Sequence, residues 1–392
     1  MRIFNTGLIG YGGFGRFLHH AWRELDNVRI VAVADAAAPG SPEGPVPVYT
    51  DWRHLLDRPE IDVLAVATPP DTHAPIAEAC MRAGKHVLIE KPLALTPSEA
   101  RALIRVRDET GVVAAVDYVF RFNPLVQALR RLTRQGAFGR LRRVAVENYA
   151  QDEQLPPSHW FWNVARSGGI LVEHGVHFID LVHFLHPAPL LAVQGLKHDR
   201  RPGQEDQVLA GMLYEGGLFA THYHAFARPG FFETTRIRLA YDLADVVLQG
   251  WIPLQGEVRA LVNTRTKPAL LAELPFDTLD TVPVEAMTDA SRPAGWGPSE
   301  AAGPADRHRI RSGGIAYLVD ECVTGTFRLG RSKQDVYAGC VRASLQDVLH
   351  KITDPSHELT APLEAGLASL DAAARATAAA RGQAAGTQEP SF

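Results

Sequence analysis

The mostly apolar segment Ile3–Ile9 runs directly into Gly10-Tyr11-Gly12-Gly13-Phe14-Gly15, a turn with the spacing GxGxxG. A strand that ends in such a turn, followed by a helix, is the fingerprint of a βαβ unit that binds a dinucleotide. Gly10 permits the tight turn, Gly12 lets backbone N–H groups approach a pyrophosphate, and Gly15 lets the helix pack close to the sheet. The stretch therefore predicts a Rossmann fold.

The residues after the turn complete this unit. An amphipathic helix and a second strand, Arg29–Ala34, lead to Asp35, which lies twenty positions beyond Gly15. A carboxylate there accepts hydrogen bonds from the ribose hydroxyls of the cofactor. No Lys or Arg occurs between Asp35 and Arg53 to bind a 2′-phosphate. We therefore expect NAD rather than NADP, against the alternative of a glycine turn that is purely structural.

Composition indicates a globular protein of two domains. The 392 residues are 46% hydrophobic, and 40 basic and 44 acidic residues are interspersed, for a net charge of −4. This pattern gives no sign of nucleic-acid or membrane binding. The N-terminus enters a strand at once, which leaves no room for a signal peptide, and the apolar runs are only strand-sized. Three scattered cysteines fit a reducing compartment, so we expect a cytoplasmic protein.

The order of predicted elements divides the chain. Residues 1–120 alternate strands and helices, which predicts a parallel sheet and a Rossmann dinucleotide-binding domain. Residues 121–381 have mostly strand-like segments, which predicts an α+β domain with a large, mostly antiparallel open sheet for substrate binding and oligomerisation. Within it, 253–304 is rich in Pro and Gly and predicts loops around short strands, as in an insertion. Residues 382–392 predict a flexible tail.

Helices are expected at both ends of the second domain. A helix over about Gly168–Leu185 interrupts the strand-like segments, and further helices are predicted over Gly314–Val323, Lys333–Ile352 and Pro362–Arg381. Near the N-terminus, Thr96-Pro97-Ser98-Glu99 has the sequence of a capping box and opens another helix.

The tripeptide Glu90-Lys91-Pro92 ends the fifth apolar strand. In an open parallel sheet this point lies at the carboxyl edge, where ligands bind, so we place Lys91 beside the nicotinamide. A partly desolvated lysine there is suited to polarise or deprotonate a substrate hydroxyl. The alternative is a surface lysine at the end of a strand.

A second group of polar residues lies in the segment 168–180. Glu173 and His177 are one helical turn apart and share a face, so they could form an acid/base pair in which the carboxylate orients the imidazole. A solvated i,i+4 pair is the alternative. Gly175 is unfavourable in a helix, which indicates a close approach by a ligand or by backbone.

Taken in order, these motifs resemble the Gfo/Idh/MocA oxidoreductases, the family of glucose–fructose oxidoreductase and inositol dehydrogenase. The resemblance rests on the glycine turn, 68–73 (Thr-Pro-Pro-Asp-Thr-His), Glu90-Lys91-Pro92, 121–124 (Arg-Phe-Asn-Pro) and 168–180 with its Gly-Gly and Gly-x-His-x-x-Asp. It implies a Rossmann domain followed by an α/β domain whose open sheet mediates homodimers or homotetramers.

The resemblance also implies roles for single residues. Lys91 would be the catalytic lysine and His177 the catalytic histidine, and Glu173 stands where many family members carry aspartate. The residues expected to contact the cofactor are Gly10, Tyr11, Gly12, Gly13, Phe14, Gly15, Asp35, Thr68, Pro69, Pro70, His73, Glu90 and Lys91.

Aromatic and polar side chains suggest where a substrate binds. The segment 158–163 (Ser-His-Trp-Phe-Trp-Asn) has aromatic faces and polar tips that suit a sugar ring, although core packing explains it equally well. We expect no metal, although Glu173, His174 and His177 have a spacing that could bind one. The residues expected to contact substrate are Arg121, His159, Trp160, Trp162, Glu173, His174 and His177.

The function expected from these features is NAD-dependent oxidation of a secondary alcohol on a sugar, cyclitol or related polyhydroxylated compound. Lys91 and His177 would remove the hydroxyl proton, and Glu173 would orient His177 or a neighbouring hydroxyl. One alternative is a redox-neutral enzyme that keeps NAD bound while it cleaves a glycoside or epimerises a carbon. Another is a non-catalytic sensor or regulatory subunit that only binds NAD.

Overall fold

The first part of the chain folds as the parallel sheet that the glycine turn predicts. The computed structural model describes residues 2–37, 45–287 and 308–384, and its first sheet has the order β3-β2-β1-β4-β5-β6 with parallel neighbours. Its strands are β1 (Phe4–Ile9), β2 (Val28–Ala34), β3 (Val48–Tyr49), β4 (Val63–Val66), β5 (His86–Ile89) and β6 (Ala114–Val116). This order confirms the Rossmann prediction.

The direction of the crossovers places the helices and the crevice. Helix α1 (Gly13–Trp22) leads from β1 to β2, whereas α2 (His73–Arg82) and α3 (Pro97–Thr110) connect strands on the other side of β1. Because such crossovers are right-handed, α1 covers one face of the sheet and α2 and α3 cover the other. The strand order reverses between β1 and β4, so a crevice opens at their carboxyl ends. Thr96 and Glu99 form the predicted capping box at the start of α3.

The second sheet is mixed and mostly antiparallel, as predicted. Within the described residues it has nine strands in the order β14-β17-β13-β12-β11-β7-β10-β9-β8, and β7 and β10 are its parallel pair. Its strands are β7 (Leu141–Gln151), β8 (Leu190–Arg201), β9 (Gln204–Tyr214), β10 (Phe219–Arg228), β11 (Thr234–Tyr241), β12 (Ala244–Gln249), β13 (Gln255–Val262), β14 (Phe276–Pro283) and β17 (Glu321–Arg328). A separate hairpin pairs β15 (Arg309–Ser312) with β16 (Ile315–Leu318).

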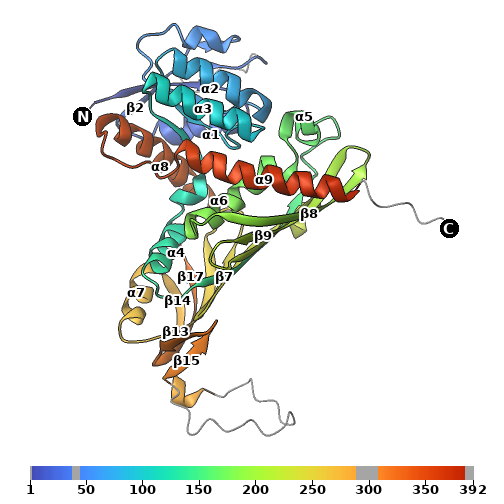
Figure 1. The fold of residues 1–392 in the computed structure, drawn as a ribbon. Coiled ribbons are helices and arrows are strands. Elements are labelled where there is room, and N and C mark those ends of the chain that lie inside the picture. The colour runs from blue at the N-terminus through green and yellow to red at the C-terminus, as the bar shows by residue number, and fades with distance from the viewer. Residues whose placement is uncertain (1, 38–44, 288–307, 385–392) are drawn as a thin grey trace, which may run out of the picture.

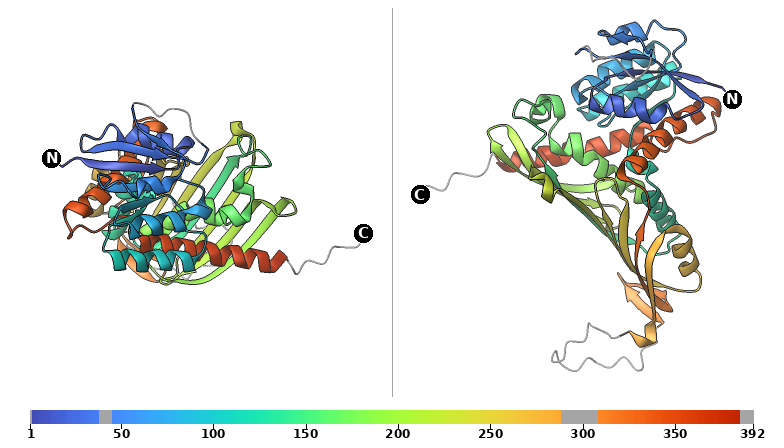
Figure 2. Two further views of the ribbon diagram at one scale, coloured as in Figure 1. Left: turned by 90° about the horizontal axis from the view of Figure 1, so that it is seen from above. Right: turned by 180° about the vertical axis from the view of Figure 1, so that it is seen from behind.

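Helices cover one face of this sheet and connect it to the Rossmann unit (Figures 1 and 2). The last two helices return to the first domain: the indole Nε1 of Trp22 donates to the carbonyl of Val341, and Arg107 pairs with Glu364 at 2.7 Å. The long final helix lies between the two sheets. The remaining α-helices are α4 (Pro124–Arg134), α5 (Val164–Ser167), α6 (Val176–Leu185), α7 (Thr266–Glu273), α8 (Lys333–Thr353) and α9 (Leu363–Ala384).

Short helical turns join several of these elements. The 3₁₀ turns are η1 (Trp52–Leu55), η2 (Pro70–Thr72), η3 (Val119–Phe122), η4 (Trp160–Trp162), η6 (Gly230–Phe232) and η7 (Val284–Ala286). The turn η5 (Leu171–Gly175), directly before α6, is instead a π-helix. No helix in the described ranges has both the length and the apolar composition to cross a bilayer.

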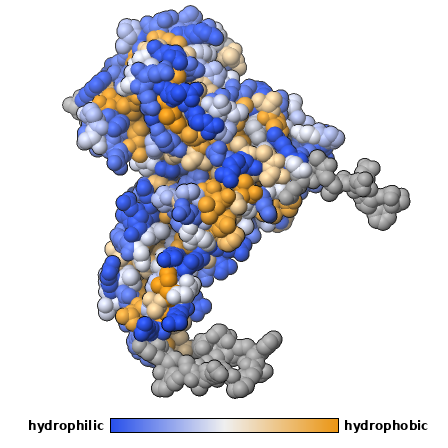
Figure 3. Space-filling model, in the orientation of Figure 1, coloured by the Kyte–Doolittle hydropathy of each residue, from blue (hydrophilic) through white to orange (hydrophobic). Residues whose placement is uncertain are grey.

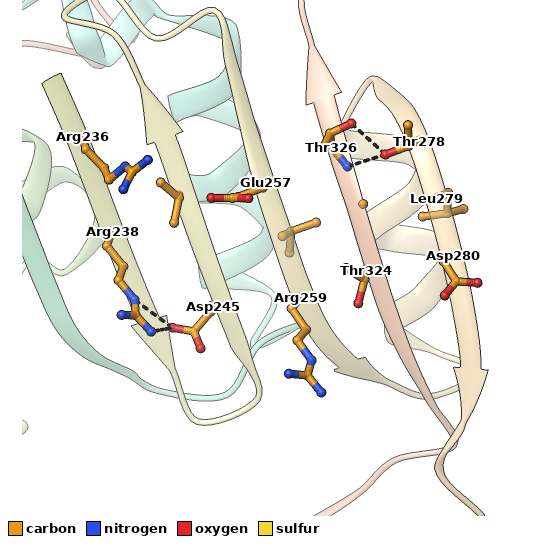
Figure 4. Close-up of a pocket in the computed structure, with 13 residues that line it drawn as sticks. Arg236, Arg238, Asp245, Glu257, Arg259, Thr278, Leu279, Asp280, Thr324 and Thr326 are labelled. Atoms are coloured by element: carbon orange, nitrogen blue, oxygen red, sulfur yellow. Dashed lines mark hydrogen bonds and ion pairs between the residues drawn. The ribbon is translucent and has the colours of Figure 1, made fainter. Parts of the chain in front are cut away.

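In the described part of the chain, no helix covers the other face of the second sheet, and this face exposes both charged and apolar side chains. At one end, a hollow of about 610 Å³ lies over β11–β14 and β17. Arg238 pairs there with Asp245 at 2.9 Å, and Figure 4 shows both residues in the lining. Toward the other end, β8 and β9 place Leu196 and Leu209 opposite one another, with 56% and 41% of their surfaces exposed. Figure 3 shows apolar surface gathered near the middle of the molecule, below α9. We call the face of the second sheet that no helix covers the open face.

Two sequence predictions are corrected. The helix predicted over Gly314–Val323 is wrong, because β16 and the start of β17 occupy it, and alternate residues of β17 are buried as in a strand. The prediction of loops around short strands in 253–304 is wrong for the described part of that range, which ends at Met287. There the eight-residue strands β13 and β14 lie on either side of β17, and α7 connects them. The rest of that range lies outside the described residues, as do residues 385–392 of the predicted tail, and α9 continues to Ala384.

Candidate active site

The glycine turn forms an open cradle at the start of α1. A Cβ at Gly10, whose φ is +92°, would lie 2.3 Å from the carbonyl oxygen of Ala67, and a Cβ at Gly15 would lie 2.1 Å from that of Gly10. These two glycines are therefore required by the fold. A Cβ at Gly12 or Gly13 would meet no described atom within 4 Å. Because unpaired N–H groups of the helix start face this space, it suits a pyrophosphate.

The predicted ribose ligand is fixed beside the turn. The Oδ2 atom of Asp35 accepts a hydrogen bond from the backbone N–H of Tyr11 at 2.7 Å, and Oδ1 accepts one from Ala37 at 2.8 Å. The Tyr11 ring is buried and its hydroxyl lies 2.7 Å from Nδ1 of His19, so only its backbone belongs to the turn. Phe14 packs on Tyr337 of α8, with ring centres 6.0 Å apart. The carboxylate is thus held where a ribose hydroxyl could reach it.

His73 joins the two loops at the carboxyl edge of the sheet. Its Nε2 lies 2.7 Å from the carbonyl oxygen of Thr68, after β4, and its Nδ1 lies 2.7 Å from that of Pro92, after β5. Pro69 and Pro70 lead into η2 between them. His73 is 1% exposed, and burial lowers its pKa although both carbonyls act to raise it. We therefore interpret His73 as a positioning residue for the loops.

Lys91 connects the Rossmann unit to the second domain. Its Nζ donates to Oε1 of Glu173 at 2.7 Å and to the backbone carbonyl of Glu173 at 3.0 Å, across 82 residues of sequence. Both side chains are largely buried, at 16% and 12% exposure. Burial acts to raise the pKa of Glu173, but the charge and hydrogen bond of Lys91, together with His174 and His73, lower it more, so the pKa lies below its ordinary value. The Lys91–Pro92 peptide bond is cis.

The pairing predicted between Glu173 and His177 is not what the structure contains. The Glu173 carboxylate binds Lys91, and within the described residues it makes no hydrogen bond to His177. The Lys91 ammonium binds the carboxylate instead, and residues 171–175 form the π-helical turn η5 in place of the α-helix that the prediction assumed. A Cβ at Gly175, where this turn ends, would lie 3.1 Å from Leu171 Cδ2, so glycine relieves crowding there.

His177 is surrounded by aromatic rings. It is 3% exposed, and the rings of Phe120 and Trp251 are each centred 5.5 Å from its own. Burial lowers its pKa well below the ordinary value, and the nearby charge of Lys91 lowers it further. Its Nδ1 atom has no hydrogen-bond partner among the described residues. At neutral pH the imidazole is therefore neutral and able to accept a proton.

Two carboxyl groups lie behind Lys91. Glu90 ends β5 and Asp117 ends the neighbouring β6, and both are buried. Burial and the neighbouring Asp117 raise the pKa of Glu90 well above its ordinary value. Asp117 was not among the residues predicted from the sequence, although its place after an apolar strand could have indicated the carboxyl edge of the sheet. No sequence signal indicated Trp251, which packs on His177, or Tyr337, which packs on Phe14.

Several predicted substrate contacts have other roles. Arg121 is bound bidentately by Asp180 at 2.8 Å and donates to the carbonyl of Thr360 at 2.7 Å, so we correct its predicted role to a buried ion pair. Trp162 is also buried, and its indole N–H donates to the carbonyl of Leu155. The polar groups of both residues are already hydrogen-bonded within the protein, so we interpret both residues as structural.

The segment before the glycine pair is joined to the loop after β4. His159 and Trp160 are half-buried neighbours with ring centres 5.2 Å apart, and they remain candidates for substrate contact. Arg166 of α5 reaches Asp71 of η2 at 3.2 Å and so links this segment to the loop after β4.

His174 belongs to a group of buried histidines that spans η5, α6 and β10. Burial lowers the pKa of His174 to about 4 and that of His222 to about 3. In the ranges described, no group of His, Cys, Asp or Glu side chains has the arrangement of a metal site. We call this group the histidine array; its members are His174, His177, His183, His222 and His224.

Comparison with known families agrees with this geometry. Residues 4–118 match the family model described as an oxidoreductase family with an NAD-binding Rossmann fold, and residues 126–240 match the model for the GFO/IDH/MocA C-terminal domain. The two matches together cover more than half of the chain. The chain belongs to the Gfo/Idh/MocA oxidoreductase family. Its N-terminal unit is thus an NAD-binding Rossmann domain.

Curated relatives are similar over part of their length. The D-apiose dehydrogenase of Paraburkholderia graminis is 33% identical over 197 residues, which are 47% of this chain and 50% of that protein. The inositol 2-dehydrogenase of Rhizobium meliloti is 31% identical over 204 residues, or 50% of this chain and 60% of that protein. The matched part of the chain thus spans about half the length of these curated relatives.

Solved structures share the whole fold. A levoglucosan dehydrogenase in complex with NADH and L-sorbose has a TM-score of 0.73 at 20% identity, and 98% of each chain is covered. GenD2 from gentamicin A biosynthesis, in complex with NAD, has a TM-score of 0.69 at 20% identity, with 97% of this chain and 95% of that chain covered.

Replacing Gly12 by valine should weaken NAD binding at least about tenfold, or about 1.4 kcal/mol, because the side chain would fill the cradle. The fold should tolerate it, with a loss of about 1 kcal/mol at most from the less favourable N-cap. Calorimetric titration with NAD and denaturant unfolding measure the two effects. Gly15→Ala is the contrasting control, which should destabilise the protein. Undiminished NAD affinity in Gly12→Val would contradict the assignment of the cradle.

The histidine array should make the protein less stable in mild acid. For His222 the ordinary pKa of 6.5 is lowered to about 3 in the folded state, so the unfolded chain binds more protons between these values. Stability is full above about pH 6.5 and falls below it, by about 1–2 kcal/mol per buried histidine at pH 5. Denaturant unfolding at pH 7 and pH 5 tests this, and His222→Leu should reduce the difference. An unchanged pH dependence in that variant would refute the interpretation.

Proposed function

We propose that this protein is an NAD-dependent dehydrogenase that oxidises a secondary alcohol of a sugar, cyclitol or related polyhydroxylated compound. The observation that carries the proposal is the meeting of Lys91, Glu173 and His177 at the carboxyl edge of an NAD-binding Rossmann sheet. Relatives named as dehydrogenases of D-apiose and of inositol support a polyol substrate.

Lys91 is suited to bind the alcohol oxygen. An ammonium group has three N–H donors, and two of them are used on Glu173, so one is left to donate to a substrate hydroxyl. Glu173 fixes the direction of that donor because it holds Nζ through both its carboxylate and its backbone carbonyl. The positive charge of Lys91 stabilises the alkoxide character that develops as the hydroxyl loses its proton.

His177 is suited to take that proton. It is neutral at neutral pH because burial lowers its pKa, and the Lys91 ammonium beside it keeps it so. The backbone of Gly12 and Gly13 would hold the pyrophosphate of NAD, and Asp35 its ribose. NAD bound there supplies the acceptor for the hydrogen and electron pair that leave the carbon.

A screen for NADH formation tests the proposal. The panel contains myo-inositol, D-apiose and levoglucosan, with NADP run alongside NAD, and absorbance reports net reduction of either cofactor. We expect NADH from at least one polyol and little NADPH. Product formation without net NADH would instead favour the redox-neutral alternative, and an NAD-binding protein inert toward the panel would favour a sensor.

Lys91→Ala and His177→Ala should each lower kcat by about 10²–10⁴, since each removes a group that positions or accepts the transferred proton. NAD affinity should persist in both variants because neither side chain belongs to the cradle. Lys267→Ala is a matched control, since Lys267 also pairs with a carboxylate, Glu321, but lies in α7. If both active-site variants kept full turnover, the assignment of these residues would be lost.

We also propose that the protein forms a homodimer or homotetramer through the open face. Leu196 and Leu209 are exposed cross-strand neighbours there, and apolar surface of this kind marks protein interfaces. Light scattering should give the mass of a dimer or tetramer, and the double variant Leu196→Glu, Leu209→Glu should lower it to that of a monomer. Arg238→Glu with Asp245→Arg, which exchanges a charged pair of the same face, is the control. A monomeric wild type would refute this proposal.

A further inference from the structure

The histidine array forms a continuous line that starts at the proposed catalytic base. The ring of His177 is centred 6.4 Å from that of His174, which is centred 5.4 Å from that of His224. The rings of His224 and His222 are stacked, 6.2 Å apart. His183 lies near enough to His222 for its charge to lower the pKa of His222. His183 is half-buried, as is His174, so the far end of the line also has partly exposed surface.

The array has an unusual number of polar atoms without partners. A neutral imidazole has one N–H donor and one acceptor nitrogen, and buried polar groups are normally hydrogen-bonded. Among the described residues, the array's buried ring nitrogens without a partner are His174 Nε2, His177 Nδ1, His183 Nδ1, and both nitrogens of His222 and of His224. Apolar side chains would fill this space without that penalty, so stability does not explain the array.

Strand β10 and the turn η5 leave room for the rings of the histidine array. His222 and His224 alternate with outward-facing residues on β10, so both point toward the helical layer. Gly175 lies above them: a Cβ there would come within 3.7 Å of His224 Nε2. Cationic groups lie at both ends, with Lys91 acting on His177 and Arg121 acting on His183. The imidazoles therefore stay neutral at rest.

We propose that the histidine array carries the proton released by alcohol oxidation from His177 to solvent at His183, through water molecules that bridge neighbouring rings. Ring spacings of 5.4–6.4 Å suit such bridges better than direct contacts. The proposal rests on the proposed dehydrogenase function.

The chemistry of the step balances. The substrate O–H bond breaks and its proton moves to His177, while the C–H hydrogen leaves with its electron pair to the bound nicotinamide. Each imidazole then accepts a proton on one nitrogen and releases one from the other. One proton reaches solvent for each cofactor molecule that is reduced.

Stopped-flow measurement separates proton release from oxidation. The holoenzyme is mixed with the panel compound that it oxidises fastest, and NADH absorbance and a pH-indicator dye are followed together in weak buffer. In the wild type both signals should rise at one rate. In His222→Leu, and in His224→Met as a second variant, the NADH burst should stay within about twofold, whereas proton release should slow at least about tenfold. Added imidazole should restore it.

Stability provides an independent readout. The denaturant midpoints of His222→Leu and His224→Met should equal or exceed that of the wild type, because each removes unpartnered polar atoms. His86→Leu is the matched control: its Nδ1 accepts a hydrogen bond from the backbone N–H of Val113 at 2.9 Å, so its midpoint should fall while proton release stays normal.

Four results would overturn the relay. Proton release that keeps pace with NADH in both array variants, or NADH and proton signals that slow together, would show that the array carries no proton. Array variants that are less stable than the wild type would show that the histidines serve the fold. A wild type that forms no NADH from any panel compound would refute the dehydrogenase itself, and the relay with it.

Discussion

The ion pair between Lys91 and Glu173 is the contact on which the candidate site depends. It joins the carboxyl end of a Rossmann strand to the turn that opens α6, in the other domain. Both groups are largely buried, and removing either partner would leave an unpaired charge in a poorly solvated place. The pair therefore fixes the distance between the cofactor cradle and His177, and it aims the lysine at the space between them.

The backbone around this pair is arranged to keep it in place. His73 holds the loops after β4 and β5 together, and the buried pair of Arg121 and Asp180 anchors η3 to α6. Helices α8 and α9 return from the second domain to pack on the first. Many contacts thus fix the relative position of two units that a single interface of loops would leave free to move.

Buried polar groups concentrate in the same region at a cost to stability. Burial raises the pKa of Glu90 and of Asp117, and the histidine array leaves ring nitrogens without a partner among the described residues. Other buried polar groups are bonded, as with Trp22 and Trp162, although a few more in the described residues, such as Thr6 Oγ1 and Asn148 Nδ2, also have no partner. Proteins retain unpaired buried groups mainly where function needs them, and many of those described here belong to the histidine array.

By itself, the sequence determined the Rossmann fold, the glycine turn, the position of Asp35 after the second strand and that of Lys91 at the sheet edge. These features depend on neighbours in sequence: strand and helix periods, turn glycines and the common end of parallel strands. The helix predicted over residues 314–323 was wrong, because β16 pairs with β15 there and the start of β17 pairs with the distant strands β13 and β14. Tertiary structure alone decided that Glu173 binds Lys91 rather than His177, that Arg121 is taken by Asp180, and that scattered histidines form a line. Each of these contacts joins residues far apart in the chain or depends on the π-helical turn, and a pattern of local spacing carries no information about either.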